Sequence, residues 1–126
     1  MTFYTSYFAN IKALPEGTTP VSICAKVPDW YTGLQYKKLA PKYEFFMEWK
    51  RNHDNAFYVK CYTEQVLSKL RQSDVVLELC ELVKGSIGMY TDIALICYEK
   101  PTDFCHRHLV AEWFRKYGYA CTEWRN

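Results

Sequence analysis

One stretch of the sequence, residues 92–117, most limits what this chain can fold into. It begins with an unbroken run of apolar or weakly polar residues, 93–98, bounded by Asp92 and by the turn-forming segment 99–101. A short apolar run between turn residues predicts a strand that is buried on both faces, as in a parallel sheet. Pro101 has no backbone N–H and disfavours helical geometry at the residue before it, so we expect the strand to end near Glu99.

An amphipathic helix is predicted directly after this strand. Thr102 or Asp103 can cap its first turn, and Gly118 suits its end because glycine adopts left-handed backbone without steric cost. We expect one buried face, because candidate core side chains recur at steps of three and four residues: His106, Leu109, Val110, Trp113, Phe114 and Tyr117.

The junction between strand and helix is the first candidate site. Open α/β folds bind ligands at such turns, at the carboxyl edge of a parallel sheet. The free amides and positive dipole end of the helix, together with Arg107, predict binding of an anion such as a phosphate or carboxylate. The same field would favour the thiolate form of Cys105. Cys97, Glu99 and His106 are expected beside them, with Glu99 orienting His106.

Structural roles for these residues remain open. His106 lies on the apolar stripe and suits a hydrogen-bonded core histidine, while Cys97 and Cys105 also suit small buried residues. Arg107 alternatively pairs with Glu99 or Asp103. No metal is expected, because there is no C-x-x-C or H-x3-H spacing and adjacent helical residues point about 100° apart.

A second candidate site is the loop of residues 27–39, which follows a predicted strand at 21–26. Trp30 or Tyr36 is a candidate to stack on a planar group, and Lys26 or Lys37 to contact a phosphate. Ser6 is expected at the same sheet edge if its strand runs parallel to the others. An ordinary packed loop, in which the tryptophan covers the core, is the alternative.

The remaining sequence predicts one α/β domain spanning residues 1–126. Strands are expected at 3–8, 21–26, 93–98 and 119–124, and helices at 41–51, 57–71, from 73 to Gly85, and after Pro101. This order is typical of a three-layer sandwich with a small, mostly parallel sheet and helices on both faces. Right-handed crossovers would then bring both candidate sites to one edge.

Composition excludes several classes of protein. The net charge is +2 without a run of like charges, so we expect no duplex nucleic acid as a partner. No apolar stretch reaches membrane-spanning length, and the N-terminal residues lack the basic start and apolar core that are typical of a signal peptide. We therefore expect a cytoplasmic protein without a membrane partner. The six cysteines show no spacing typical of a disulfide framework. The oligomeric state is not predicted.

Two motifs resemble the signature of the domain-of-unknown-function 488 family. These are the C-x-E strand end at Cys97 and Glu99 and the C-H-R helix start at 105–107. Segments 4–8, 22–42 and 45–50 are similar to that family as well. The resemblance implies a compact, cytoplasmic α/β protein, and it implies neither an activity nor a cofactor.

Three functions remain candidates from the sequence. We favour binding, with or without turnover, of a small anionic ligand, phosphate-bearing and nucleotide-like, at the strand end and helix start. The first alternative is an enzyme in which Cys105 is the nucleophile or His106 the general acid or base. The second is a protein-interaction or inhibitor module in which the cluster only supports the fold. No cofactor is expected.

Overall fold

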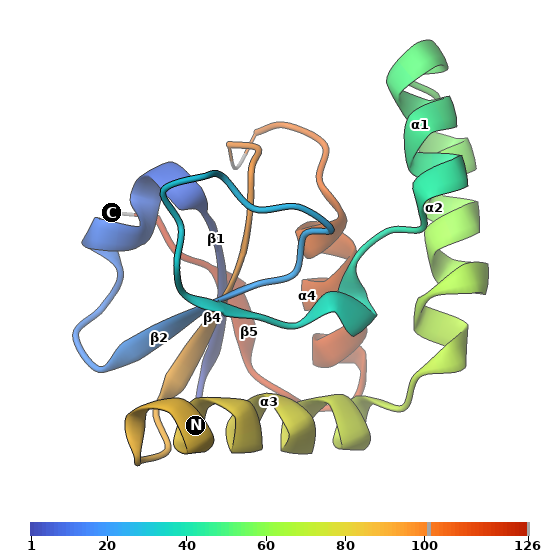
Figure 1. Cartoon of the computed structure of the whole chain (residues 1–126). Coiled ribbons are helices and arrows are strands. Elements are labelled where there is room, and N and C mark those ends of the chain that lie inside the picture. The colour runs from blue at the N-terminus through green and yellow to red at the C-terminus, as the bar shows by residue number, and fades with distance from the viewer. Residues whose placement is uncertain (101, 126) are drawn as a thin grey trace.

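The computed structural model describes residues 1–100 and 102–125. In this part of the chain, five parallel strands form one sheet in the order β3-β2-β4-β1-β5 (Figure 1). The α/β class that the sequence predicts, with its parallel sheet, is therefore confirmed. The strands are β1 (Phe3–Tyr7), β2 (Thr18–Ser22), β3 (Leu34–Gln35), β4 (Asp92–Cys97) and β5 (Cys121–Glu123).

Four α-helices and three short 3-10 helices surround the sheet in the described residues. The α-helices are α1 (Tyr43–Asn52), α2 (Asn55–Gln65), α3 (Gln72–Ile87) and α4 (His106–Lys116). The 3-10 helices are η1 (Phe8–Ala13), η2 (Lys37–Leu39) and η3 (Leu67–Lys69). Among the described residues, no helix is both long and apolar enough to span a membrane.

Strand β4 separates two hydrophobic cores. Residues 93–97 are completely buried, because β4 has a neighbouring strand on each side and protein on both faces. Ile93 and Leu95 belong to the larger core, whereas Ala94 and Ile96 belong to the smaller one. Successive side chains of a strand point to opposite faces, which explains the alternation. The expectation of a strand covered on both faces is met.

The two faces of the sheet are covered differently. The larger core contains buried side chains of all four α-helices, with Phe45, Tyr62, Leu79 and Phe114 as examples. The smaller core is closed by Phe8 of η1 and by Cys24 and Tyr31 of the segment after β2. Figure 1 accordingly shows η1, in blue, on the side away from the α-helices. Helices thus cover both faces, but the second face has only a 3-10 helix and a loop.

Several boundaries differ from those that the sequence predicts. Strand β2 begins at Thr18 and ends at Ser22, so the strand predicted at 21–26 overlaps it only at Val21 and Ser22. Helix α3 continues through Gly85, and Gly88 ends it with a left-handed backbone at φ 83°. The expected loop at 27–39 contains β3 and η2. Helix α4 begins at His106 with Cys105 as its N-cap, so neither Thr102 nor Asp103 caps it.

Candidate functional site

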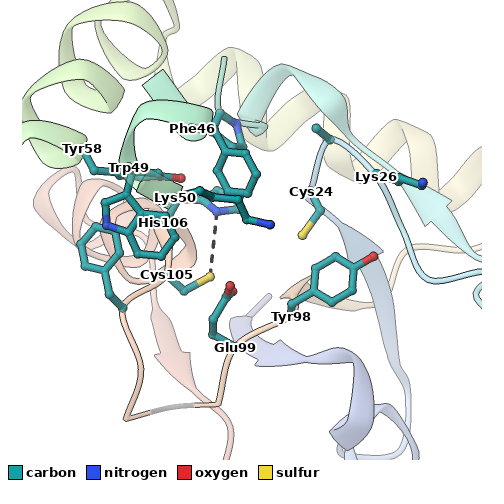
Figure 2. A pocket seen from close by; sticks show the side chains of 13 residues that line it. Cys24, Lys26, Phe46, Trp49, Lys50, Tyr58, Tyr98, Glu99, Cys105 and His106 are labelled. Carbon is teal, nitrogen blue, oxygen red and sulfur yellow. Dashed lines mark hydrogen bonds between the residues drawn. The ribbon is translucent and has the colours of Figure 1, made fainter. Parts of the chain in front are cut away.

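A pocket of about 470 Å³ lies where β2 and β4 end and α4 begins (Figure 2). Three segments build most of it: residues 24–26 after β2, the end of α1, and the turn between β4 and α4. Its lining residues are Cys24, Ala25, Lys26, Pro41, Phe46, Trp49, Lys50, Tyr58, Tyr98, Glu99, Phe104, Cys105 and His106. Parallel strands bring their carboxyl ends to one edge, which explains why segments far apart in sequence meet here.

One wall of the pocket is aromatic. The ring of Trp49 lies 5.5 Å from that of Phe104, and Phe104 meets Tyr58 edge to face at 5.0 Å. The indole Nε1 of Trp49 donates to Asn55 Oδ1 at 2.8 Å, and this bond fixes the orientation of the ring. Figure 2 shows Phe46 on the same side. Such a surface suits a planar or apolar group of a ligand.

Charged side chains of both signs reach this pocket. The ammonium group of Lys50 lies 5.3 Å from the centre of the Phe46 ring. Figure 2 shows the Lys50 ammonium group and the Glu99 carboxylate directed toward the middle of the pocket, whereas the exposed Lys26 side chain extends away from them. Lys50 is therefore the cation best placed to meet an anionic group of a ligand.

His106 is buried and neutral near pH 7. Its Nε2 lies 2.8 Å from the carbonyl oxygen of Ile23. Because a carbonyl only accepts, Nε2 carries the proton of the neutral ring and Nδ1 keeps a lone pair. Burial, with a further contribution from the charge of Arg107, lowers the pKa of His106 to about 4. Nδ1 lies 3.9 Å from Cys105 Sγ.

Cys97 and Cys105 form a disulfide across the turn between β4 and α4. Cys105 lines the pocket, whereas Cys97 is completely buried. The sequence predicts no disulfide framework, and this pairing corrects that expectation: the two cysteines are eight positions apart in the sequence, and the fold brings strand end and helix start together. The other four cysteines are free: Cys24, Cys61, Cys80 and Cys121.

The structure places Arg107 elsewhere than the sequence predicts. Its side chain is completely buried, and its Nε and Nη2 atoms donate to the two carboxylate oxygens of Glu123 at 3.1 and 3.0 Å. Nη1 donates to Cys97 Sγ at 3.1 Å. The guanidinium group is thus enclosed and does not line the pocket. The structure does not place Arg107 at the pocket as the sequence predicts, and its carboxylate partner is Glu123 rather than Glu99 or Asp103.

Three further predicted ligand-binding residues lie away from the pocket. Ser6 is buried in β1 and accepts a hydrogen bond from Asn10 Nδ2 at 3.2 Å. Tyr36 is buried in the larger core and donates to the Glu78 carboxylate. Trp30 is 62% exposed and meets Phe8 edge to face at 6.1 Å. The structure brings Lys26, Glu99, Cys105 and His106 together, but not these three.

One further thiol faces the pocket. Cys24 follows β2, and burial, assisted by the negative charge of Glu99, raises the pKa of its thiol to about 12. A thiol reacts through its thiolate, so we expect Cys24 to react slowly near neutral pH.

Cys97, Cys105 and His106 bring together atom types that bind metal ions. Their two Sγ atoms and a ring nitrogen lie within 4.8 Å of one another. We expected adjacent residues 105 and 106 to diverge as in a helix, but Cys105 precedes the helix and its backbone is extended. In the disulfide form, however, neither sulfur is a thiolate, and thiolates are the form that binds zinc. That no metal is bound stays a prediction.

Sequence reasoning missed the contribution of α1 to the pocket. The sequence predicts the helix at 41–51 but assigns none of its residues to a site. The buried residue of α1 is Phe45, while Tyr43 is 71% exposed and Phe46 and Trp49 are half-buried. A lysine next to two aromatic residues at helical spacing was the available signal, although such a pattern is common at core margins.

Comparison with curated proteins and with solved structures found no match. One family matches residues 9–118, which include β2, β4 and all thirteen pocket residues. It is described as the active DUF488-N3 subclade, and the C-x-E and C-H-R motifs at the pocket lie within the matched segment. The chain therefore belongs to the DUF488-N3a family, within the domain-of-unknown-function 488 proteins that its motifs resemble.

Proposed function

We propose that the pocket binds a small anionic ligand with a planar part, namely a phosphate-bearing, nucleotide-like molecule. The observation that carries this proposal is the position of Lys50 beside the aromatic wall formed by Phe46, Trp49 and Phe104. A planar group would stack on the aromatic side chains while the anionic group meets the ammonium ion. Arg107 has no direct part in this binding, because its guanidinium group is enclosed.

The size and polarity of the pocket support this class of ligand. A volume of about 470 Å³ falls within the range of small-molecule sites, and five aromatic side chains line it: Phe46, Trp49, Tyr58, Tyr98 and Phe104. Glu99 would repel an anion placed beside it, but its carboxylate is suited to accept a hydrogen bond from a ligand hydroxyl or amino group. We therefore place the anion at Lys50 and the neutral polar edge of the ligand near Glu99.

A cysteine-dependent or histidine-dependent reaction remains the second candidate function. Cys105 lies in the pocket wall with His106 Nδ1 beside its sulfur atom, which favours chemistry at this point. A pKa of about 4 makes His106 a weak base near neutral pH. Any covalent step is therefore more reasonably assigned to sulfur than to imidazole.

We also propose a cytoplasmic location, supported by the four free cysteines, because reducing compartments preserve free thiols. Fusion to a fluorescent protein and imaging of intact cells, followed by fractionation, would test this. Recovery of the protein in a membrane or extracellular fraction would contradict it.

Calorimetric titration with adenosine monophosphate, adenosine and inorganic phosphate tests the ligand proposal. We expect the monophosphate to bind more tightly than either part alone, because it uses the aromatic wall and Lys50 together. Lys50→Gln should weaken its binding about fivefold, the effect of losing one partly exposed ionic contact. Arg51→Gln is the matched control, since Arg51 is adjacent on α1, exposed, and paired with Glu48.

Two results would contradict the proposal. The first is equal binding of adenosine and adenosine monophosphate, since the anionic group would then contribute nothing. The second is an equal loss of affinity in the Lys50 and Arg51 variants, since a general change in surface charge would then explain both.

A further inference from the structure

The two sulfur atoms of the Cys97–Cys105 disulfide have different access to ligands. Cys105 precedes α4, lines the pocket and is 4% exposed, whereas Cys97 ends β4 and has no exposed surface. Of the two sulfur-bearing residues, Cys105 is therefore the one that a molecule held in the pocket would contact. Figure 2 shows the Cys105 sulfur atom directed toward the pocket.

Cys97 has a fixed cationic neighbour. Arg107 Nη1 donates to its sulfur atom at 3.1 Å, while Glu123 holds the other side of the guanidinium group and the Tyr7 ring lies 5.9 Å from its centre. The Glu123 carboxylate offsets part of the positive charge, but one N–H remains directed at sulfur. A charged donor held in this way stabilises a thiolate on Cys97 relative to a thiol.

The neighbour of the Cys105 sulfur atom is neutral. His106 Nδ1, 3.9 Å away, has a lone pair because Nε2 carries the ring proton to Ile23. This nitrogen suits the acceptor role toward an S–H group of Cys105. The surroundings thus place a proton acceptor beside Cys105 and a cationic donor beside Cys97 once the disulfide is reduced.

We propose that Cys97 and Cys105 are an exchanging dithiol–disulfide pair, in which Cys105 forms a mixed disulfide with a small thiol held in the pocket. Cys97 is the leaving thiolate when the protein disulfide is opened and the resolving thiolate when it is re-formed. The substrate class, a low-molecular-mass thiol or disulfide carrying an anionic group, rests on the proposed function of the pocket.

The exchange is balanced in electrons without a cofactor. A substrate thiolate attacks Cys105 Sγ, the Cys97–Cys105 bond breaks, and its electron pair goes to Cys97 Sγ beside Arg107. A second substrate thiolate attacks the substrate sulfur of the mixed disulfide and releases Cys105. The Cys105 sulfur then takes up a proton and donates a hydrogen bond to His106 Nδ1. Two substrate thiols are thereby oxidised to a disulfide while the protein disulfide is reduced, and the reverse sequence reduces a substrate disulfide.

The remaining cysteines strengthen this assignment. The four others, Cys24, Cys61, Cys80 and Cys121, are free, although two of them are only half-buried. In a compartment that keeps such thiols reduced, a single disulfide beside a ligand pocket is characteristic of transient, catalytic or redox-sensing exchange.

Reaction of the reduced protein with dithiobis(nitrobenzoate), an anionic aromatic disulfide, tests the proposal. The protein carries Cys61→Ser and Cys80→Ser, so that the half-buried thiols do not consume reagent. We expect release of two nitrothiobenzoate ions per protein and an intact mass lower by two hydrogen atoms, with peptide mapping locating the disulfide at Cys97 and Cys105. A nitrothiobenzoate adduct that persists on the protein would overturn the proposal.

Two single variants separate the roles of the cysteines. Cys97→Ser should keep one nitrothiobenzoate on Cys105, because no resolving thiolate remains. Cys105→Ser should react about a hundredfold more slowly, since Cys97 is sealed from the pocket. Equal rates for the two variants, with circular dichroism showing both folded, would overturn the assignment. If a variant does not fold, the protein that retains both cysteines still tests the proposal. Its oxidation without a persistent adduct would support the cysteine pair, and a persistent adduct would overturn it.

A neutral reagent distinguishes this inference from the proposed function. Dipyridyl disulfide lacks the anionic groups, so it should react more slowly relative to a model thiol than the nitrobenzoate reagent does. If the two reagents react at equal rates relative to a model thiol, and both leave the protein oxidised without an adduct, the cysteine pair would be supported and the anion preference contradicted. Binding of adenosine monophosphate together with a persistent adduct would support the ligand proposal and overturn the cysteine pair.

Discussion

Arg107 of α4 and Glu123 of β5 form an ion pair in which two guanidinium nitrogens each donate to a different carboxylate oxygen, at 3.1 and 3.0 Å. The arginine side chain is completely buried and the glutamate side chain is 12% exposed. The pair joins the helix that begins at the pocket to an edge strand of the sheet, and it positions the N–H that reaches Cys97 Sγ. It therefore links the fold to the chemistry of the site.

Breaking this pair should destabilise the protein strongly. Arg107→Gln leaves a largely buried carboxylate without its cation, and we expect it to lower the free energy of unfolding by roughly 3 kcal/mol. Urea denaturation measures this change. Arg51→Gln is the matched control, because the Arg51–Glu48 pair is exposed and should contribute less than about 1 kcal/mol.

The double variant Arg107→Gln/Glu123→Gln refines the same experiment. Removing both charges eliminates the unpaired carboxylate, so we expect it to recover part of the lost stability. The ion-pair account would be contradicted if the double variant lost more free energy of unfolding than the two single variants lose in sum.

The buried His106 should make stability depend on pH. Its pKa falls from 6.5 in the unfolded chain to about 4 in the fold, so between these values the unfolded state binds more protons. The free energy of unfolding is therefore expected to decrease by up to roughly 3 kcal/mol as the pH falls from 6.5 to about 4. Above pH 6.5, His106 is neutral in both states and adds no pH dependence.

Urea denaturation over this pH range, in the original chain and in His106→Gln, measures the contribution of His106. We expect the variant to show a shallower pH dependence, whatever its absolute stability. His53→Asn is the control, since His53 is exposed and asparagine tolerates its left-handed backbone at φ 52°. Parallel curves for the original chain and His106→Gln would contradict the assignment.

The aromatic wall leads to a prediction about affinity. Trp49→Leu should weaken binding of adenosine monophosphate about tenfold, because stacking of a base on an aromatic side chain contributes about 1–3 kcal/mol. Trp30→Leu should leave the affinity unchanged, since Trp30 lies outside the pocket and is 62% exposed. Calorimetry compares the two, and an equal loss in both variants would count against the pocket as the binding site.

The sequence predicts β1 and β4 better than it predicts the surroundings of the site. The apolar run in β4 is buried because it is central, and alternation along β1 and β4 determines which side chains enter each core. Helix boundaries are less predictable where two residues could each end the helix. Gly85 is accommodated within α3, and only Gly88, with its left-handed backbone, ends the helix. Near Pro101, the extended backbone of Cys105 delays the start of α4.

The same limits apply to the site. Cys105, His106 and Glu99 are found by the C-x-E and C-H-R motifs because those motifs lie on the strand end and helix start that form the pocket. The partner of Arg107 is on β5, sixteen residues further along the chain, and no local pattern reveals that pairing. Lys50 and Trp49 reach the pocket through the placement of α1, which depends on tertiary packing rather than on local sequence.

Differences in thiol reactivity provide another prediction. In the reduced protein, iodoacetamide near neutral pH should modify Cys24 about a hundredfold more slowly than a model thiol, because burial raises the pKa of Cys24 to about 12. Mass spectrometry of peptides follows each cysteine separately. In urea, Cys24 should react like the other cysteines. Rapid modification of Cys24 in the folded protein would show that its thiol is less enclosed than the structure indicates.

The most direct measurement of ligand binding at the pocket uses the indole N–H signals of the four tryptophans in nuclear magnetic resonance spectra. Trp49 lies in the aromatic wall, while Trp30, Trp113 and Trp124 lie outside the pocket. Titration with adenosine monophosphate should shift the Trp49 signal and leave the other three in place. A shift of the Trp30 signal with an unchanged Trp49 signal, or no shift at all, would contradict the proposed site.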